Sequence, residues 1–385
     1  MTNENLSFYE FFSGGGMARL GLGQRWKCLF ANDSCEKKAR AYKSNFGESP
    51  ELVVRDVHKI TTQELPGEPS LVWASFPCQD LSLAGNGNGL KGERSGTFWA
   101  FWRLMQALAR EGRSTPLIVL ENVIGAITSN EGRDFRAILQ AMNNAGYCVG
   151  ALVINAVHFV PQSRPRLFIL AVDSRLEIPR SLKSDCPNML WHPKTLITAH
   201  NELPQALHDS WVWWHLPAPP IRRSTLADMV ESSPTTVEWH TNEETKRLLR
   251  MMSRANLRKV EQASRLKKPV IGTVYRRTRP DESGRKMQRA EVRFDQISGC
   301  LRTPVGGSSR QTILVVNGDS IRSRLLSSRE AARLMGVTDN YNLPENYTDA
   351  YHLMGDGLVI PVVSWLEAHL LYPLGLLKVS ASEAA

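Results

Sequence analysis

The chain has 385 residues, of which 42% are hydrophobic and 22% charged, so it is long enough for one large folded domain and a smaller one and shows no sign of extended disorder. Its net charge is +9, and residues 246–293 hold 16 Lys/Arg against four Asp/Glu, a local balance of +12 that leaves about −3 for the rest. Such a concentration is typical of a protein with a polyanionic partner, although a solvated basic surface has the same composition.

The first 150 residues alternate short apolar runs with helical patterns. We expect strands at residues 7–12, 28–32, 52–55, 71–75 and 117–120, and helices near residues 17–24, 35–46, 98–111 and 133–145. Strands that alternate with helices in this way predict a parallel sheet covered on both faces. Two further apolar runs, at 151–157 and 167–172, are too close together for a crossover helix, so they should pair antiparallel at the sheet edge.

The composition changes after residue 173, where prolines and tryptophans become frequent and the basic segment follows. A helical pattern resumes at Ser327, with Ser327 and Glu330 in capping-box spacing, and a last helix over residues 360–371 should return to the first domain. We therefore expect a first domain at 1–173, a second at 174–323 and a C-terminal segment at 324–385 that packs on the first domain.

Several features bear on the compartment. The N-terminus lacks a basic segment followed by an apolar stretch, so we expect no secretory signal. Prolines and charged residues interrupt the apolar stretch at 358–377, which favours a packed helix over a membrane span. The six cysteines form no CxxC pair and no His/Cys cluster, which disfavours zinc and favours free thiols in the cytoplasm.

Polar residues and glycines follow the first three expected strands. Ligands of open parallel sheets bind at the carboxyl ends of the strands, where Gly14–Gly16, Asp33 and Asp56 stand. Glycines allow a tight turn close to a ligand, and the two carboxylates could accept hydrogen bonds from a ribose and an adenine amino group. Each alone would more often be a turn or a helix cap, but together they predict a nucleoside-containing cofactor. Arg19 breaks a GxGxxG pattern, which disfavours a nicotinamide dehydrogenase.

A thiol, a carboxylate and two guanidiniums follow the later strands. Cys78 comes after the fourth strand, Glu121 after the fifth, and Arg164 and Arg166 stand at the start of the last. Because the last strand should be antiparallel, its start lies at the same sheet edge, where the four groups can converge. The set suits a nucleophile, an acid and charge stabilisers, whereas a core cysteine beside a structural Glu–Arg pair is the alternative.

Seven motifs, in this order, resemble those of the DNA cytosine-5 methyltransferases of bacterial restriction–modification systems. They are FxGGG at residue 12, PCQ at 77, SGTF at 95, ENV at 121, QxRxR at 162, RLLSSRE at 324 and GDGLV at 355. The resemblance covers residues 7–172 and 294–371. It implies an α/β, Rossmann-like S-adenosylmethionine-dependent methyltransferase sheet, with a catalytic and cofactor-binding domain at 1–173 and a smaller target-recognition domain at 174–323.

The resemblance also implies a chemistry. Cys78 would attack C6 of a flipped-out cytosine, Glu121 would hold N3 and the exocyclic amine, and Arg166 with Arg164 would contact the O2 side and orient Glu121. The implied S-adenosylmethionine contacts are Phe12, Gly14, Gly15, Gly16, Asp33, Asp56, Val57, Pro77, Phe98 and Asp356. The family usually has Asn at the position of Asp356. Residues 83–96 match the family's mobile loop.

The implied partners are double-stranded DNA and a cognate restriction endonuclease acting on the same site, with the protein itself a monomer. The segment from Tyr275 to Arg279 is assigned to the DNA surface, and the tryptophans near 191–214 to a local core. A tRNA cytosine-5 methyltransferase remains an alternative, disfavoured by the large recognition region. A non-catalytic DNA-binding relative is another, disfavoured by the intact Cys78, Glu121 and Arg166.

Overall fold

The computed structural model describes residues 6–77, 96–266, 268–280, 284–303 and 309–377. Contacts divide the chain into two compact units. The first comprises Met1–Ile154, Pro165–Pro219 and Ile360–Ala385, and the second comprises Asn155–Arg164 and Pro220–Val359. Residues 174–219 therefore fold with the first unit and residues 324–359 with the second, whereas the sequence suggested boundaries at 173 and 323. The assignment of a recognition function to residues 174–323 stays a prediction.

The first unit is built on a seven-stranded sheet of order β3-β2-β1-β4-β5-β7-β6. Its strands are β1 Leu6–Phe11, β2 Trp26–Asp33, β3 Leu52–Val54, β4 Leu71–Ala74, β5 Leu117–Val123, β6 Tyr147–Asn155 and β7 Pro165–Asp173. Strands β1 to β5 pair in parallel, and β7 runs antiparallel to β5. The expected α/β class and the reversed direction of the last strand are thus confirmed.

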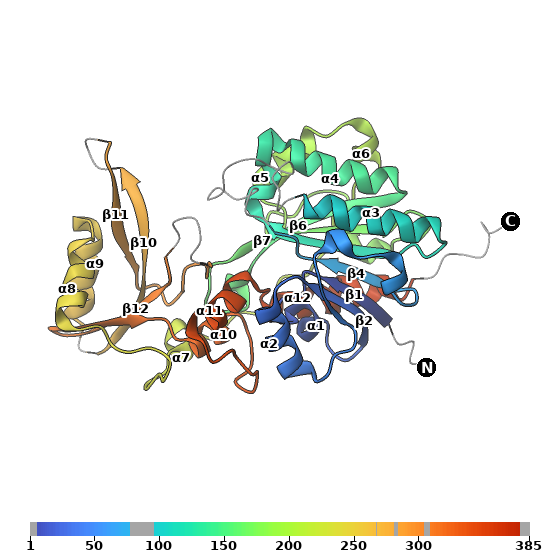
Figure 1. Cartoon of the computed structure of the whole chain (residues 1–385). Coiled ribbons are helices and arrows are strands. Elements are labelled where there is room, and N and C mark those ends of the chain that lie inside the picture. Colours follow the sequence, from blue (N-terminus) through green and yellow to red (C-terminus); the bar gives the residue numbers. More distant parts are fainter. Residues whose placement is uncertain (1–5, 78–95, 267, 281–283, 304–308, 378–385) are drawn as a thin grey trace. The chain divides into compact units, whose positions relative to one another are not determined.

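Helices cover both faces of this sheet, as expected for buried parallel strands. They are α1 Met17–Leu22, α2 Glu36–Phe46, α3 Thr97–Arg110 and α4 Arg133–Asn144, with short 3-10 turns at Val57–Lys59, Thr62–Glu64, Ile124–Ile127, Ser129–Gly132 and Ala156–His158. Figure 1 shows α3 and α4 on one face and α1 on the other. The α3 side packs Phe11, Ala74 and Leu120 of the sheet against Phe101 of α3 and Leu139 of α4.

The last described helices follow α11 (Tyr347–Asp356), and α12 (Ile360–Leu366) packs on α1, which confirms the expected return of the last helix. Helix α12 continues through a π-helical turn (Glu367–Leu371) into α13 (Tyr372–Gly375). A Cβ at Gly21 would lie 2.4 Å from that of Val363, so only glycine permits this approach. By length and composition the run Tyr347–Gly375 could cross a membrane, but half of its most apolar window is buried, as in a core helix.

The tryptophan-rich segment covers the edge of the sheet at β6. Its elements are a 3-10 turn Arg180–Leu182, β8 Lys183–Ser184, α5 Lys194–Asn201, α6 Gln205–Asp209 and β9 Trp213–Trp214. The backbone of Val149 in β6 bonds to Ser210 and Val212, so β6 leaves no long open edge there. Trp191 and Trp214 are completely buried, and the Trp191 indole donates to the carbonyl of Leu216. Trp191 and Trp214 thus belong to a local core, as expected, whereas Trp211 and Trp213 are only partly buried.

The second unit contains a four-stranded antiparallel sheet of order β11-β10-β12-β13. Its elements are α7 Leu226–Met229, α8 Asn242–Arg250, α9 Arg254–Ser264, β10 Val270–Pro280, β11 Lys286–Arg293, β12 Thr312–Asn317, β13 Ser320–Leu325, α10 Ser328–Leu334 and α11 Tyr347–Asp356. Leu248 of α8 and Val260 of α9 pack on one face of the sheet, against Val274, Val292 and Leu314. The expected capping box of Ser327 and Glu330 begins α10.

Candidate active site

The turn after β1 takes a conformation that favours glycine. Phe12, Gly14 and Gly16 all have positive φ, at 58°, 56° and 78°. A Cβ at Gly16 would lie 2.3 Å from the Phe46 ring, whereas a Cβ at Gly14 would meet nothing within 4 Å. The turn is therefore packed from behind at Gly16 and open at Gly14, which leaves room for a ligand beside the backbone.

Asp33, at the end of β2, is bonded to this turn. One carboxylate oxygen accepts from the N–H of Gly14 at 2.9 Å, and the other accepts from the N–H of Cys35 at 2.8 Å. Its side chain is almost buried. The structure thus brings two of the predicted cofactor residues into direct contact and assigns Asp33 a role in shaping the turn.

Asp56 and Val57 begin the 3-10 turn that follows β3. Asp56 caps this turn by accepting from the N–H of His58 at 2.9 Å. That hydrogen bond and a second one from the His58 ring lower the pKa of Asp56. The Asp56 side chain remains 53% exposed, so it can accept a further hydrogen bond, whereas Val57 is buried in the core.

Two buried polar residues outside the seven motifs, Asn32 and Glu10, support these strand ends. Asn32 is buried and its amide donates to the carbonyls of Val53 and Arg55, which joins the ends of β2 and β3. Glu10 of β1 is buried and accepts from the N–H of Ala18 at 3.2 Å, while its second oxygen has no hydrogen-bond partner among the described residues. Burial raises the pKa of Glu10 to about 8. In the sequence, both residues could have been found as polar residues within otherwise apolar strands.

Glu121 and Arg166 form an ion pair at the carboxyl end of β5. The antiparallel register places Arg166 opposite Val123, two residues beyond Glu121 and therefore on the same face. Arg166 Nε lies 3.2 Å from Glu121 Oε1, with side chains 17% and 11% exposed. The predicted convergence of these two groups is confirmed, and both keep some access to solvent.

The segment that leads to Cys78 lies beside this pair. The amide of Asn122 donates to the carbonyl of Phe76 at 3.4 Å, which links β5 to the residues that follow β4. Phe98, expected to flank a cofactor with Pro77, packs its ring 5.5 Å from that of Phe76. Cys78 itself, and residues 83–95 of the expected mobile loop, lie outside the described residues.

Arg164 belongs to the second unit, and its guanidinium is hydrogen-bonded to backbone carbonyls of that unit. The guanidinium donates to the carbonyls of Leu301 at 2.7 Å, Gly355 at 2.9 Å and Gly357 at 2.8 Å, and the residue is 2% exposed. Its expected contact to a base stays a prediction, and the contacts present indicate a structural role. Nothing in the motif distinguished Arg164 from Arg166.

In the sequence, Asp356 stands between Gly355 and Gly357, whose carbonyls bond to Arg164. Its carboxylate accepts a hydrogen bond from the Thr303 hydroxyl. A Cβ at Gly355 would lie 2.9 Å from the Thr303 nitrogen, which explains the glycine. Gln162, the first residue of QxRxR, is fully buried and bridges the N–H of Leu301 and the carbonyl of Leu334. The motif was the signal for Gln162, which was not among the predicted site residues.

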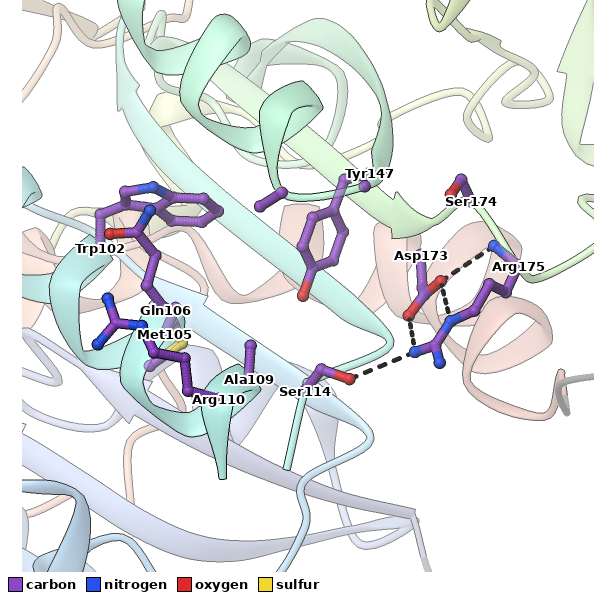
Figure 2. A pocket seen from close by; sticks show the side chains of 12 residues that line it. Trp102, Met105, Gln106, Ala109, Arg110, Ser114, Tyr147, Asp173, Ser174 and Arg175 are labelled. Atoms are coloured by element: carbon purple, nitrogen blue, oxygen red, sulfur yellow. Dashed lines mark hydrogen bonds and ion pairs between the residues drawn. The ribbon is translucent and has the colours of Figure 1, made fainter. Parts of the chain in front are cut away.

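A cavity of about 440 Å³ lies at the other end of the sheet (Figure 2). Trp102 and Tyr147 line it, together with Asp173 at the end of β7. Its more buried polar groups are already paired, since Arg175 binds Asp173 at 2.6 Å and the Tyr147 hydroxyl donates to the carbonyl of Thr115. None of the predicted site residues lines this cavity, so it is separate from the predicted active site. Among the described residues no group of three or more His, Cys, Asp or Glu could hold a metal.

Comparison with known proteins shows the family. The model of the family described as C-5 cytosine-specific DNA methylase matches residues 6–370. The chain belongs to this family. The expected family resemblance and the expected methyltransferase sheet are both confirmed, and the protein is a DNA (cytosine-5)-methyltransferase.

Relatives of this cytosine methylase match it at different lengths. The Type II methyltransferase M.NgoBI of Neisseria gonorrhoeae is 26% identical over 92% of this chain and 89% of its own. M.HhaI of Haemophilus parahaemolyticus is 23% identical over 94% and 93%. M.BsuFI of Bacillus subtilis is 33% identical over 175 residues, which are 45% of this chain but only 41% of the relative.

Solved structures show the same fold. The Dnmt2 methyltransferase of S. pombe superimposes with a TM-score of 0.56 at 17% identity, and the Entamoeba histolytica methyltransferase EhMeth with 0.62 at 14% identity. In each case the match covers 96% of this cytosine methylase and 99% of the other chain.

Proposed function

We propose that this cytosine methylase transfers a methyl group from S-adenosylmethionine to C5 of a cytosine within a specific duplex DNA sequence, through a covalent bond between Cys78 and C6 of a flipped-out base. The observation that carries the proposal is the partly exposed Glu121–Arg166 ion pair, 3.2 Å apart at the carboxyl end of β5. The hydrogen bond between Asn122 and Phe76 joins the same end of β5 to the residues that precede Cys78 in the sequence.

The electron flow of the reaction explains why these groups are needed. The Cys78 thiolate adds to C6, and the electron pair of the C5–C6 double bond becomes available at C5, which takes the methyl group. Loss of the C5 proton then restores the double bond and expels the thiolate. Glu121 holds N3 and the exocyclic amine while charge develops on the ring, and Arg166 fixes Glu121 and contacts the O2 side.

The residues after the first three strands fit the proposed cofactor. A Cβ at Gly14 would meet open space, so a ligand can lie close to the backbone there, and Asp56, after β3, keeps half of its side chain exposed. When bound, S-adenosylmethionine supplies an electrophilic methyl group. In this chain Phe12, Gly14–Gly16, Asp33, Asp56, Val57, Pro77 and Phe98 would hold it, with Asp356 as a further contact.

Transfer of a labelled methyl group tests the proposal. The wild type should label duplex DNA, Cys78→Ala should label none, and DNA containing 5-fluorocytosine should form a covalent adduct with Cys78 when S-adenosylmethionine is present. Equal transfer by the wild type and Cys78→Ala would refute the covalent mechanism. A preference for tRNA over plasmid DNA would favour the RNA-directed alternative, and specific binding without transfer would favour the non-catalytic one.

We further propose that the enzyme acts as a monomer in the cytoplasm, beside a restriction endonuclease that cuts the same sequence. Methylation by this enzyme should protect DNA from that endonuclease. Bisulfite sequencing of DNA from cells that express the protein would give the sequence and the modified cytosine, and the molecular mass of the enzyme–DNA complex would give the oligomeric state.

A further inference from the structure

The β10–β11 hairpin of the second unit carries more positive charge than its own carboxylates balance. Its two strands hold six Lys/Arg and one Glu. The register places Arg277 directly opposite Arg289. Like charges that face each other across an antiparallel pair destabilise a sheet. An anionic partner outside the hairpin would offset this repulsion.

The arginines of interest lie on the face of the sheet opposite α8 and α9. Side chains alternate along β10, so Tyr275, Arg277 and Arg279 share one face, while Val274 belongs to the core formed with α8 and α9. Figure 1 shows these two helices beside the hairpin. Glu291 of β11 stands opposite Tyr275 and therefore on the arginine face.

Glu291 organises this face. Its Oε1 accepts from both Nε and Nη2 of Arg279, each at 3.1 Å, and its Oε2 lies 3.8 Å from Nε of Arg277. The guanidinium of Arg277 also stacks 4.5 Å from the centre of the Tyr275 ring. Partial burial acts to raise the pKa of Glu291, but the hydrogen bonds from Tyr275 and Arg279 outweigh it and lower the pKa, which keeps the carboxylate ionised.

A guanidinium can make two bidentate contacts, one through Nε and Nη2 and one through Nη1 and Nη2. Glu291 takes the first edge of Arg279, which fixes the plane and direction of the second. The carboxylate also offsets the charge of Arg279 and so weakens its attraction to a phosphate. An oriented but partly neutralised guanidinium suits the O6 and N7 acceptors of guanine better than a phosphate.

We propose that Arg279, held by Glu291, reads a guanine in the sequence that the enzyme methylates, so that Glu291 is a positioning residue for sequence specificity. This inference rests on the proposed function, because it assumes that the second unit meets the duplex that is methylated. Arg277, whose Nε lies farther from the Glu291 carboxylate at 3.8 Å, and Arg289 opposite it would contact phosphates instead.

The test is a methylation profile of a duplex library with randomised bases around the target cytosine, read by bisulfite sequencing. Glu291→Gln and Arg279→Lys should each reduce the preference for guanine at one and the same position by about tenfold, because a single bidentate contact gives discrimination of that order. Preferences at the other positions should stay as in the wild type. Glu243→Gln is the matched control, since Glu243 pairs with Arg250 at 3.2 Å on α8 and both are exposed.

Other outcomes separate the two proposals. If both hairpin variants lowered methylation evenly on all sequences and reduced the salt dependence of binding, Arg279 would be a phosphate contact and the inference would be wrong. If the wild type methylated no duplex in the library, the proposed function itself would fail. If thermal unfolding showed that Glu291→Gln is not folded, the methylation profile of Arg279→Lys alone would test the inference.

Discussion

Glu121 and Arg166 meet because β5 ends where the antiparallel β7 begins, so a carboxylate and a guanidinium 45 positions apart in the sequence share one sheet edge. Glu121→Gln should lower the single-turnover rate of methyl transfer by roughly 100-fold or more, because an amide cannot supply the charge and proton that the activated ring requires. The melting temperature should change little. Glu64→Gln, at a partly exposed 3-10 helix cap, should leave the rate unaltered. An unchanged rate for Glu121→Gln would refute its assigned role.

Glu10 gives a prediction for stability against pH. Its folded-state pKa is raised to about 8 by burial, so the native state holds its proton more tightly than the unfolded chain. The resulting stabilisation is complete below the ordinary carboxyl pKa near 4.5 and is lost as the pH rises towards 8. Glu10→Gln removes this titration. The melting temperature of the variant minus that of the wild type should therefore increase between about pH 5 and pH 8; a constant difference would contradict it.

At the scale of elements, the glycine turn depends on packing between α1 and α2. Gly16→Ala would combine a positive φ with a Cβ 2.3 Å from Phe46, whereas Gly47→Ala shares the positive φ but meets nothing within 4 Å. Both should lose stability in urea unfolding, by about 1 kcal/mol for Gly47→Ala and about 1–3 kcal/mol more for Gly16→Ala. Calorimetry should show weaker S-adenosylmethionine binding for Gly16→Ala alone. Equal losses would mean that the Phe46 contact relaxes freely.

The two arginines of the QxRxR motif should respond differently to substitution, because their side chains pack against different groups. Arg164→Ala would remove the guanidinium donor from three carbonyls, two of them in buried hydrogen bonds, and should destabilise the protein by about 3 kcal/mol or more. Arg166→Ala leaves the nearly buried carboxylate of Glu121 without its charged partner and should cost about 1–3 kcal/mol of stability while abolishing most activity. Urea unfolding and methyl transfer measured on both variants check this contrast. It would fail if Arg166→Ala were the less stable of the two.

At the scale of the whole molecule, the basic hairpin should dominate the salt dependence of DNA binding. The logarithm of the association constant falls with the logarithm of salt in proportion to the phosphates contacted. Arg277→Ala and Arg289→Ala should each reduce the slope by about 1. Arg110→Ala, beside the cavity at the other end of the first unit's sheet, should leave it as in the wild type. Titrations at several salt concentrations measure the slopes, and equal effects of all three variants would contradict the assignment.

Local patterns predicted much of the first unit and the start of α10 in the second. Apolar runs, glycines and caps act over a few residues, so the strands, the helices around them and the capping box at Ser327 could be placed from the sequence. The joining of residues 174–219 to the first unit was not predicted, because it depends on backbone bonds from Val149 to Ser210 and Val212, which no local pattern encodes.

The sequence by itself determined the elements and the order of the chemical groups along them, because side-chain periodicity and turn preferences are properties of short segments. Only the tertiary structure decided what Arg164 and Arg166 do. Residues two apart share a face only inside a strand, and Arg164 precedes β7, so its guanidinium is directed to the carbonyls of Leu301, Gly355 and Gly357. The partner of a buried polar group depends on packing between distant segments, and that packing exists only in the folded structure.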